Sequence, residues 1–179
     1  YFRKHISNEF SAHLLNSEGA LRYPNQAFDM VRIGISLYGF TENQQLKNEL
    51  IPAITWSSAV SQVKTIQSGD FIGYGCSYQA VNDMTIAIIP VGYADGFRRS
   101  LSNGVGKVVI NGQLCPVVGR VCMDMIMVDV TNLPVHENDA VELIGSRQSM
   151  DEFAAAMQTI PYEVMTGLSN RMQRIYVED

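Results

Sequence analysis

The chain has 179 residues, of which 46% are hydrophobic and 17% are charged, and its formal net charge is −5. These proportions are typical of a globular protein with one large domain or two small ones, and they exclude a disordered or collagen-like chain. The acidic balance leaves no cationic stripe to neutralise phosphates, so we expect no nucleic-acid partner. No apolar run approaches the roughly 18 residues of a membrane span, so we expect no membrane partner either.

The three cysteines, Cys76, Cys115 and Cys122, form an odd set without a C-x-x-C pair. They encode neither a disulfide framework nor a zinc site, so we expect no bound metal. Unpaired thiols fit a reducing compartment, and we therefore expect a cytoplasmic protein. The sequence starts at Tyr1 rather than at a methionine, which we interpret as a processed piece or a fragment of a longer polypeptide.

The opening segment has the spacing of one β–α–β unit. A short strand is predicted over 11–16 and a second over 30–40, and the residues between them leave room for only a short helix. A single unit of this kind cannot bury both faces of its strands. We therefore expect this segment to be an incomplete part of an α/β domain.

From the polar segment 41–50 onward, strands dominate the pattern. We predict strands over 54–66, 84–92, 107–110, 113–118, 125–130, 140–144 and 171–177. Many short strands at even spacing favour a closed β-barrel or a sandwich. Ser149 and Glu152 form a capping signal for a helix over 149–158, and Pro161 either ends that helix or opens the next turn.

Tyr74 stands between Gly73 and Gly75, just past a predicted strand. Glycines on both sides permit a sharp turn that leaves the ring projecting, and a projecting phenol can donate, accept or titrate. The structural alternative is a tyrosine that closes a barrel corner. The two interpretations stay open on these residues alone.

Two further polar clusters follow buried strands. Residues 92–96 (GYADG), with Arg98 and Arg99 after them, gather anion-binding groups at a strand end, or else form a plain turn with solvated arginines. Arg120, Cys122 and Asp124 are spaced to share one face of a strand. An arginine and an aspartate on one face require a polar cavity or a buried salt bridge between them.

Small and polar residues gather at the ends of the two opening strands: His13, Asn16 and Ser17 on the first, and Arg32, Gly34 and Ile35 on the second. The ends of parallel strands are where α/β proteins hold phosphates through backbone amides. This signal is weak by itself, because so short a pattern also arises by chance.

In this order, the stretches HLLNSEGA, FDMVRIGISLYG, GDFIGYGCSY, IPVGYADGFRR, VGRVCMDM and IPYEV resemble alanine racemase, the bacterial fold-type III pyridoxal-phosphate enzyme. The resemblance implies a mainly β chain. Residues 42–179 would form the C-terminal β-barrel-like domain, and residues 1–41 the last β–α–β piece of the preceding α/β (TIM) barrel.

The resemblance also implies that the stretch bearing the family's cofactor-binding lysine is missing. The chain's own lysines match no such motif: Lys4, Lys47, Lys64 and Lys107. We therefore expect the chain alone to be inactive. The parent polypeptide would be the active form, and it could be a fusion with another cell-wall enzyme.

Pyridoxal 5′-phosphate is the cofactor that the resemblance implies. Its phosphate would be held by Ser17, by the backbone amides of Gly34 and Ile35, and by the hydroxyl of Tyr162. Arg32 would face the pyridine nitrogen and keep it unprotonated, because an arginine is permanently cationic. His13 would lie behind that arginine, and Asn16 would be a supporting residue nearby.

Racemisation requires two acid/base groups on opposite faces of the substrate Cα. The resemblance implies that the cofactor lysine is one and Tyr74 the other, contributed across a homodimer interface. A phenol ordinarily titrates near pH 10, so a basic tyrosine needs positive charge or hydrogen bonding nearby. The Met123 amide would contact the substrate carboxylate. The residues implied to line the access channel are Tyr93, Arg99, Arg120 and Asp124.

The implied reaction is the interconversion of L-alanine and D-alanine for peptidoglycan, since a narrow polar channel favours a small amino acid. Two alternatives stay open. One is a serine racemase of the same family, because Cys76 and Ser77 replace the small residue and threonine that members often carry. The other is a non-catalytic β-barrel module that keeps only a dimerisation surface.

Overall fold

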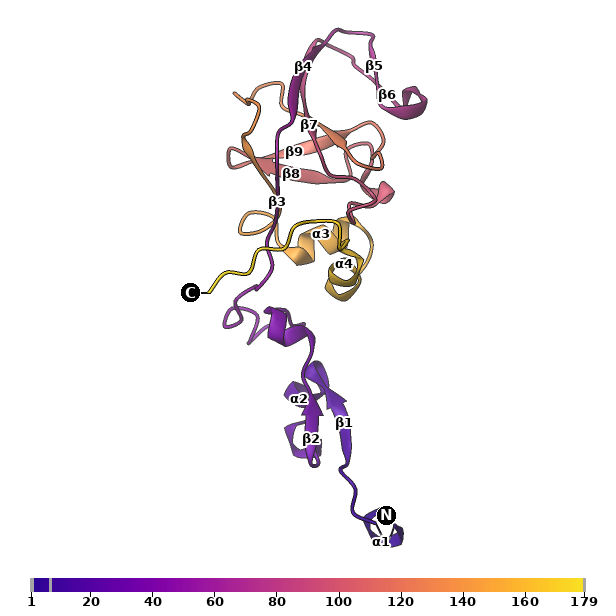
Figure 1. Cartoon of the computed structure of the whole chain (residues 1–179), viewed down its shortest axis with the longest axis vertical. Helices are drawn as coiled ribbons and strands as arrows, with labels where there is room; N and C mark the ends of the chain where they lie inside the picture. The colour runs from indigo at the N-terminus through magenta and orange to yellow at the C-terminus, as the bar shows by residue number, and fades with distance from the viewer. Residues whose placement is uncertain (1, 7, 179) are drawn as a thin grey trace. The chain divides into compact units, whose positions relative to one another are not determined.

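The computed structural model describes residues 2–6 and 8–178. The chain divides after Ile54 into two compact units. Its helices are α1 (Phe2–His5), α2 (Ser17–Arg22), α3 (Met150–Ala156) and α4 (Pro161–Gly167), with short 3₁₀ helices at Pro24–Gln26, Ile35–Tyr38, Tyr74–Cys76 and Arg99–Leu101. Its strands (Figure 1) are β1 (His13–Asn16), β2 (Met30–Arg32), β3 (Trp56–Ala59), β4 (Gln62–Ile66), β5 (Phe71–Ile72), β6 (Tyr78–Gln79), β7 (Met84–Ile89), β8 (Lys107–Ile110), β9 (Gln113–Val118), β10 (Ile126–Asp129) and β11 (Ala140–Ile144).

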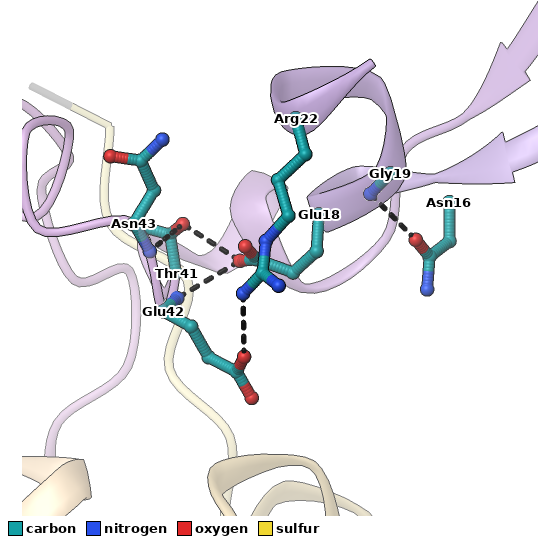
Figure 2. Close-up of polar contacts among 7 residues, drawn as sticks. All are labelled: Asn16, Glu18, Gly19, Arg22, Thr41, Glu42 and Asn43. Carbon is teal, nitrogen blue, oxygen red and sulfur yellow. Dashed lines mark hydrogen bonds and ion pairs between the residues drawn. The ribbon is translucent and has the colours of Figure 1, made fainter. Parts of the chain in front are cut away.

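The first unit is built on a β–α–β motif. Strands β1 and β2 are parallel, with Asn16 opposite Arg32, and α2 joins them. Asn16 begins the helix, because its side-chain oxygen accepts a hydrogen bond from the Gly19 amide at 2.9 Å (Figure 2). The predicted β–α–β unit is confirmed.

The second strand of this unit is shorter than predicted. The backbone leaves the extended region at Gly34 (φ −128°, ψ −88°), and a 3₁₀ helix replaces the rest of the expected strand. Gly39 ends that helix at φ 84°, and a Cβ there would overlap the Ile51 carbonyl oxygen. The prediction of one strand over 30–40 was therefore wrong after residue 32.

Polar contacts hold the segment after β2 against α2 (Figure 2). The Glu18 carboxylate accepts hydrogen bonds from the Thr41 hydroxyl at 2.8 Å and from the Glu42 amide at 2.9 Å. Arg22 pairs with the Glu42 carboxylate at 3.3 Å. The Asn43 amide donates to the Thr41 hydroxyl oxygen at 3.0 Å. The start of the polar segment 41–50 is thus part of this unit's packing.

The second unit contains a seven-stranded antiparallel sheet in the order β3-β11-β8-β9-β10-β7-β4. Its two edge strands are separated by only Val60 and Ser61. The Val60 amide donates to Asp139 at one edge, and the Ser61 amide donates to Ile88 at the other, each at 2.9 Å. The sheet must therefore curl until its margins meet. This confirms a barrel-like fold, and it also shows that the strand predicted over 54–66 is divided into β3 and β4.

Buried aromatic side chains from β3, from the loop after β7 and from α3 meet in the core of this unit. The rings of Trp56, Phe97 and Phe153 pack edge to face, with centroids 5.6 to 6.3 Å apart. Phe153 comes from α3, so this cluster anchors the helix to the sheet. Burial of three aromatic rings stabilises the unit by several kcal/mol in order of magnitude. Both hydrogen bonds of the predicted Ser149–Glu152 capping box are present.

The helical pair α3 and α4 lies at one end of the second unit, and the β5–β6 hairpin lies at the other (Figure 1). Pro161 opens α4 at its first position. The strand predicted over 171–177 was wrong: Ile175, Tyr176 and Val177 are exposed, and no described segment offers them a partner ladder. No helix in the described ranges is long and apolar enough to cross a membrane.

Candidate functional site

Tyr74 projects from the loop between β5 and β6. Gly73 (φ 78°) and Gly75 (φ 69°) both adopt left-handed backbone conformations, which side chains with a Cβ rarely adopt. The tight turn that they allow leaves the Tyr74 side chain 73% exposed. The ring therefore projects, as one of the two sequence interpretations predicted, and does not pack into the core.

Arg120 packs against both glycines of this turn. A Cβ on Gly75 would lie 3.0 Å from the Arg120 Nη1 atom, and a Cβ on Gly73 would lie 3.2 Å from the Arg120 backbone nitrogen. The guanidinium forms no ion pair with any residue that the structure describes. A cation without a carboxylate partner therefore lies against the backbone that presents the Tyr74 phenol.

The predicted strand face shared by Arg120, Cys122 and Asp124 was wrong. Residues 120–125 form a loop between β9 and β10, so alternate residues there do not point to one side. Arg120 faces the tyrosine loop, whereas Asp124 pairs with Arg171 at 2.6 Å. The two predicted partners of a salt bridge therefore belong to different contacts.

The loop at residues 91–97 lies directly against the loop at 120–125. The Tyr93 amide donates to the Cys122 carbonyl and the Ala94 amide donates to the Met123 carbonyl, each at 3.0 Å. These contacts use the Met123 carbonyl but leave its amide without an acceptor in the described part of the chain. The side chains of Tyr93 and Met123 are 43% and 52% exposed. The Met123 N–H is thus a backbone donor available to a ligand.

Asp95 is the buried acid of this region, only 5% exposed. Its carboxylate accepts a hydrogen bond from the Gly92 amide at 2.8 Å and pairs with the Arg171 Nε atom at 2.9 Å. Arg171 also contacts Asp124, and this hydrogen bond, with the charge of Asp95, raises the pKa of the guanidinium. The sequence did not indicate Arg171 as a site residue. Arg171 follows Asp124 by 47 residues, and it lies in a segment, 171–177, that we predicted to be a strand.

The two neighbouring arginines after this loop have different environments. Arg98 pairs with the Glu163 carboxylate at 2.6 Å. Hydrogen bonds from Thr159 and Arg98 lower the pKa of Glu163. Arg99 is exposed and makes no ion pair among the described residues. Of the predicted pair, only Arg99 keeps its charge available to an anion.

The residues at the strand ends of the first unit can form a small anion site. Ser17 is 2% exposed, and its hydroxyl oxygen accepts a hydrogen bond from the Gly34 amide at 2.8 Å, which leaves the hydroxyl proton free to donate. A Cβ on Gly34 would meet no atom within 4 Å, so space is open beside it. The buried Ser36 hydroxyl has no hydrogen-bond partner among the residues that the structure describes. The Ser17 hydroxyl and the open space at Gly34 fit a phosphate group.

The other predicted residues of this unit lie on β1 and β2. The Arg32 guanidinium donates to the Leu14 carbonyl at 3.1 Å, which fixes its position beside β1. His13 is exposed at the start of β1, and the Asn16 side chain is used as the cap of α2. No group of three His, Cys, Asp or Glu side chains suited to a metal ion occurs among the described residues.

Comparison with known proteins identifies the family. The model of the alanine racemase C-terminal domain matches residues 53–176, and the model of the alanine racemase N-terminal domain matches residues 2–42. The chain belongs to the alanine racemase family. The alanine racemase of Vesicomyosocius okutanii is 40% identical over 96% of this chain and 49% of its own length. That of Clostridium novyi is 39% identical over 99% of this chain and 48% of its own length. The chain thus spans about half the length of the curated relatives it matches.

Solved alanine racemases have the same fold. The enzyme of Bartonella henselae, described with covalently bound pyridoxal phosphate, is 36% identical and aligns with a TM-score of 0.85 over 95% of this chain and 48% of its own. The enzyme of Bacillus anthracis, described with bound L-Ala-P, is 32% identical and aligns with a TM-score of 0.90 over 99% of this chain and 47% of its own.

The two units divide the site residues that the alanine racemase resemblance implies. The second unit brings Arg120 to the turn of Tyr74 and joins the loop of Met123 to that of Tyr93. Tyr162, 42% exposed in the first turn of α4, also belongs to this unit. The implied phosphate contacts Ser17, Gly34 and Ile35 belong to the first unit, as do His13, Asn16 and Arg32.

The three thiols of this alanine racemase chain should differ in reactivity. Cys76 is exposed, whereas burial raises the pKa values of Cys115 and Cys122. A raised pKa reduces the thiolate fraction, and the thiolate is the nucleophile. Near neutral pH we expect one fast alkylation per chain, at Cys76, with the other two at least about tenfold slower. Mass spectrometry during iodoacetamide treatment measures the rates. Cys76→Ser should remove the fast phase, and equally fast labelling of Cys122 would contradict the prediction.

Proposed function

We propose that this chain is part of a cytoplasmic alanine racemase that interconverts L-alanine and D-alanine for peptidoglycan synthesis. Residues 1–41 would complete its α/β barrel, and residues 42–179 would form its C-terminal β-domain. The family matches to residues 2–42 and 53–176 support these assignments, although the structure itself divides later, after Ile54. The absence of disulfides among the three cysteines supports a reducing compartment.

The presentation of Tyr74 is the observation that carries this proposal. Its phenol projects from a turn that two left-handed glycines make possible, with the Arg120 guanidinium against the same turn. A tyrosine needed only for packing would be buried, and one tolerated by chance would not need two such glycines. The arrangement suits an acid/base group that acts on a substrate outside its own unit.

The first unit would hold pyridoxal 5′-phosphate. The Ser17 hydroxyl and the Ile35 amide would bind its phosphate. The Gly34 amide would do so after releasing its hydrogen bond to the Ser17 oxygen, and the Tyr162 hydroxyl would add a fourth contact. When bound, this cofactor withdraws electrons from the substrate Cα, so that the Cα proton can be removed. Arg32 would face the pyridine nitrogen, where its permanent positive charge disfavours protonation of the ring. His13 and Asn16 would support this side of the site.

Proton transfer would then need groups on both faces of the substrate. The Tyr74 Oη atom would remove or deliver the Cα proton on one face, and a lysine outside this sequence would serve the other. The Met123 N–H would bind the substrate carboxylate. An access channel would be lined by Tyr93, Arg99, Arg120 and Asp124. A short side chain such as that of alanine suits a channel bounded by these large groups.

A second copy of the chain would receive the tyrosine loop. Phe71 in β5 and Val81 just after β6 belong to the hairpin that carries this loop, and they are 57% and 80% exposed. Exposed apolar groups on the hairpin of a functional loop are typical of a surface that a partner covers. We propose that the active form is a homodimer in which each Tyr74 serves the cofactor site of the partner subunit.

A racemisation assay tests the proposal. The complete polypeptide with pyridoxal phosphate should interconvert the alanine enantiomers and act more slowly on serine. The 179-residue chain alone should be inactive, because Lys64 and Lys107 are exposed on β-strands and Lys4 and Lys47 lie outside any lysine motif of the family. Faster turnover of serine would favour the serine racemase alternative. A stable dimer that racemises neither amino acid would favour the non-catalytic module.

A further inference from the structure

One arginine joins the two loops on which substrate binding is proposed to depend. Arg171 follows α4, in a turn. Its Nε atom lies 2.9 Å from the Asp95 Oδ1 atom, and its Nη2 atom lies 2.6 Å from the Asp124 Oδ1 atom. We call Asp95, Asp124 and Arg171 the Arg171 cluster. No other arginine pairs with two carboxylates among the described residues.

The Asp95 end of the cluster is anchored firmly. Its carboxylate also accepts the Gly92 amide at 2.8 Å, and its backbone carbonyl accepts the Ser169 amide at 3.1 Å. A Cβ on Gly96 would lie 2.9 Å from the Gly167 carbonyl oxygen, so the chain leaving α4 is in close contact with this loop. The buried Asp95 therefore gives Arg171 a fixed position.

The Asp124 end has fewer contacts. The Asp124 side chain is 51% exposed, and its carboxylate contacts no other described group than Arg171. Asp124 follows Met123 directly, and the Met123 amide has no acceptor of its own. The Arg171 guanidinium thus connects the buried Asp95 to Asp124, the residue next to the free Met123 amide. An arginine suits this role because its planar guanidinium can bind two carboxylates in fixed directions.

We propose that Arg171 is a positioning residue that holds the Met123 amide in place for the substrate carboxylate. This inference rests on the proposed function, in which that amide binds alanine. Arg171 would not touch the substrate. It would restrict the motion of residues 123 and 124 and so reduce the entropy lost when the carboxylate binds.

Kinetics of the complete enzyme give the first test. Arg171→Ala should raise KM for alanine about tenfold and change kcat less than about threefold, because carboxylate binding is lost without loss of the acid/base group. Arg171→Lys keeps the charge but cannot form both contacts in the same directions, so its KM should be intermediate. The matched control is Arg174→Ala, since Arg174 is also exposed and, in the described ranges, its guanidinium hydrogen-bonds only to Asn170. It should change neither constant more than about twofold.

A second readout needs neither cofactor nor turnover. Labelling with ¹⁵N-methionine gives one amide signal for each of the nine methionines, and the signal missing in Met123→Leu identifies Met123. In the 179-residue chain, Arg171→Ala should lower the order parameter of the Met123 amide from about 0.85 to below about 0.6. The Met84 amide in β7 and the Met150 amide in α3 should be unaffected, and Arg174→Ala should change none of them.

The outcomes separate the two proposals. A complete enzyme that racemises no alanine would reject the proposed function, while the amide measurement would still decide whether Arg171 orders Met123. An unchanged KM in both Arg171 variants, or a Met123 amide that keeps its order, would overturn the positioning role. If Arg171→Ala does not fold, Arg171→Lys and Asp124→Asn give the same two readouts. In a double-mutant cycle, Asp124→Asn should add little to the KM of Arg171→Lys.

Discussion

Tyr74→Phe should reduce kcat/KM for alanine about 10³-fold in the complete enzyme, within the range found when a general acid/base group is removed. The substitution deletes only the hydroxyl of a side chain that is 73% exposed, so folding and thermal stability should not change. The measurement is the rate of racemisation in each direction. Both directions should slow, because a group that removes the Cα proton in one direction delivers it in the other.

Tyr78→Phe is the matched control for this substitution. Tyr78 belongs to the same hairpin but packs, half-buried, against a core cluster of the second unit. Loss of its hydroxyl should leave kcat/KM within about twofold of the parent value. If Tyr74→Phe kept full activity, the assignment of the acid/base group would be wrong, even if the family assignment stood.

Gly92→Ala should strongly destabilise the second unit. A Cβ at this position would overlap the carbonyl oxygens of Cys122 and Met123, which already accept hydrogen bonds from Tyr93 and Ala94. Backbone atoms held in this way cannot move aside without breaking those bonds. We expect a loss of about 3 kcal/mol, the upper part of the range for overpacking, and a fall in Tm of about 6–12 °C.

Gly167→Ala provides the control for the glycine substitution. Gly167 is the last residue of α4, and a Cβ there would meet no atom within 4 Å. Alanine also favours the helix more than glycine does, so its Tm should be equal or slightly higher. Thermal unfolding followed by circular dichroism compares the two variants. Equal Tm values for both would mean that the two loops do not pack as closely as described.

Local signals in the sequence predicted much of the second unit. Asn111 (φ 48°) and Gly112 (φ 77°) form the hairpin turn between β8 and β9, because both residue types tolerate a left-handed backbone. The bounds of these two strands agree with the prediction. The capping residues Ser149 and Glu152 correctly predicted the start of α3, because their interaction lies within one turn of helix. The glycines around Tyr74 permitted a projecting ring, but they left a tyrosine closing a barrel corner equally open, and only the structure decides between the two.

Contacts between distant segments could not be predicted in this way. Nothing near Asp124 indicates that its partner is Arg171, and nothing near Arg120 indicates that it packs against Gly75. The segment 54–66 divides into two strands because its first half pairs with β11 and its second half pairs with β7. Both partners lie later in the chain, so the segment's own residues do not indicate the division. Alternation of side chains predicts a strand but does not identify its neighbours.

The meeting of the sheet margins at Val60 and Ser61 has a consequence for folding. Strand β3 pairs with β11, where Trp56 lies opposite Ile144. During synthesis, β3 therefore has no pairing partner until β11 has been made, when most of the polypeptide is complete. Long-range pairing of this kind makes folding slow and leaves a hydrogen-bonding edge open to aggregation in the meantime. A nascent chain that stops before β11 would therefore be a natural substrate for chaperones, whereas the finished domain should unfold as one cooperative unit.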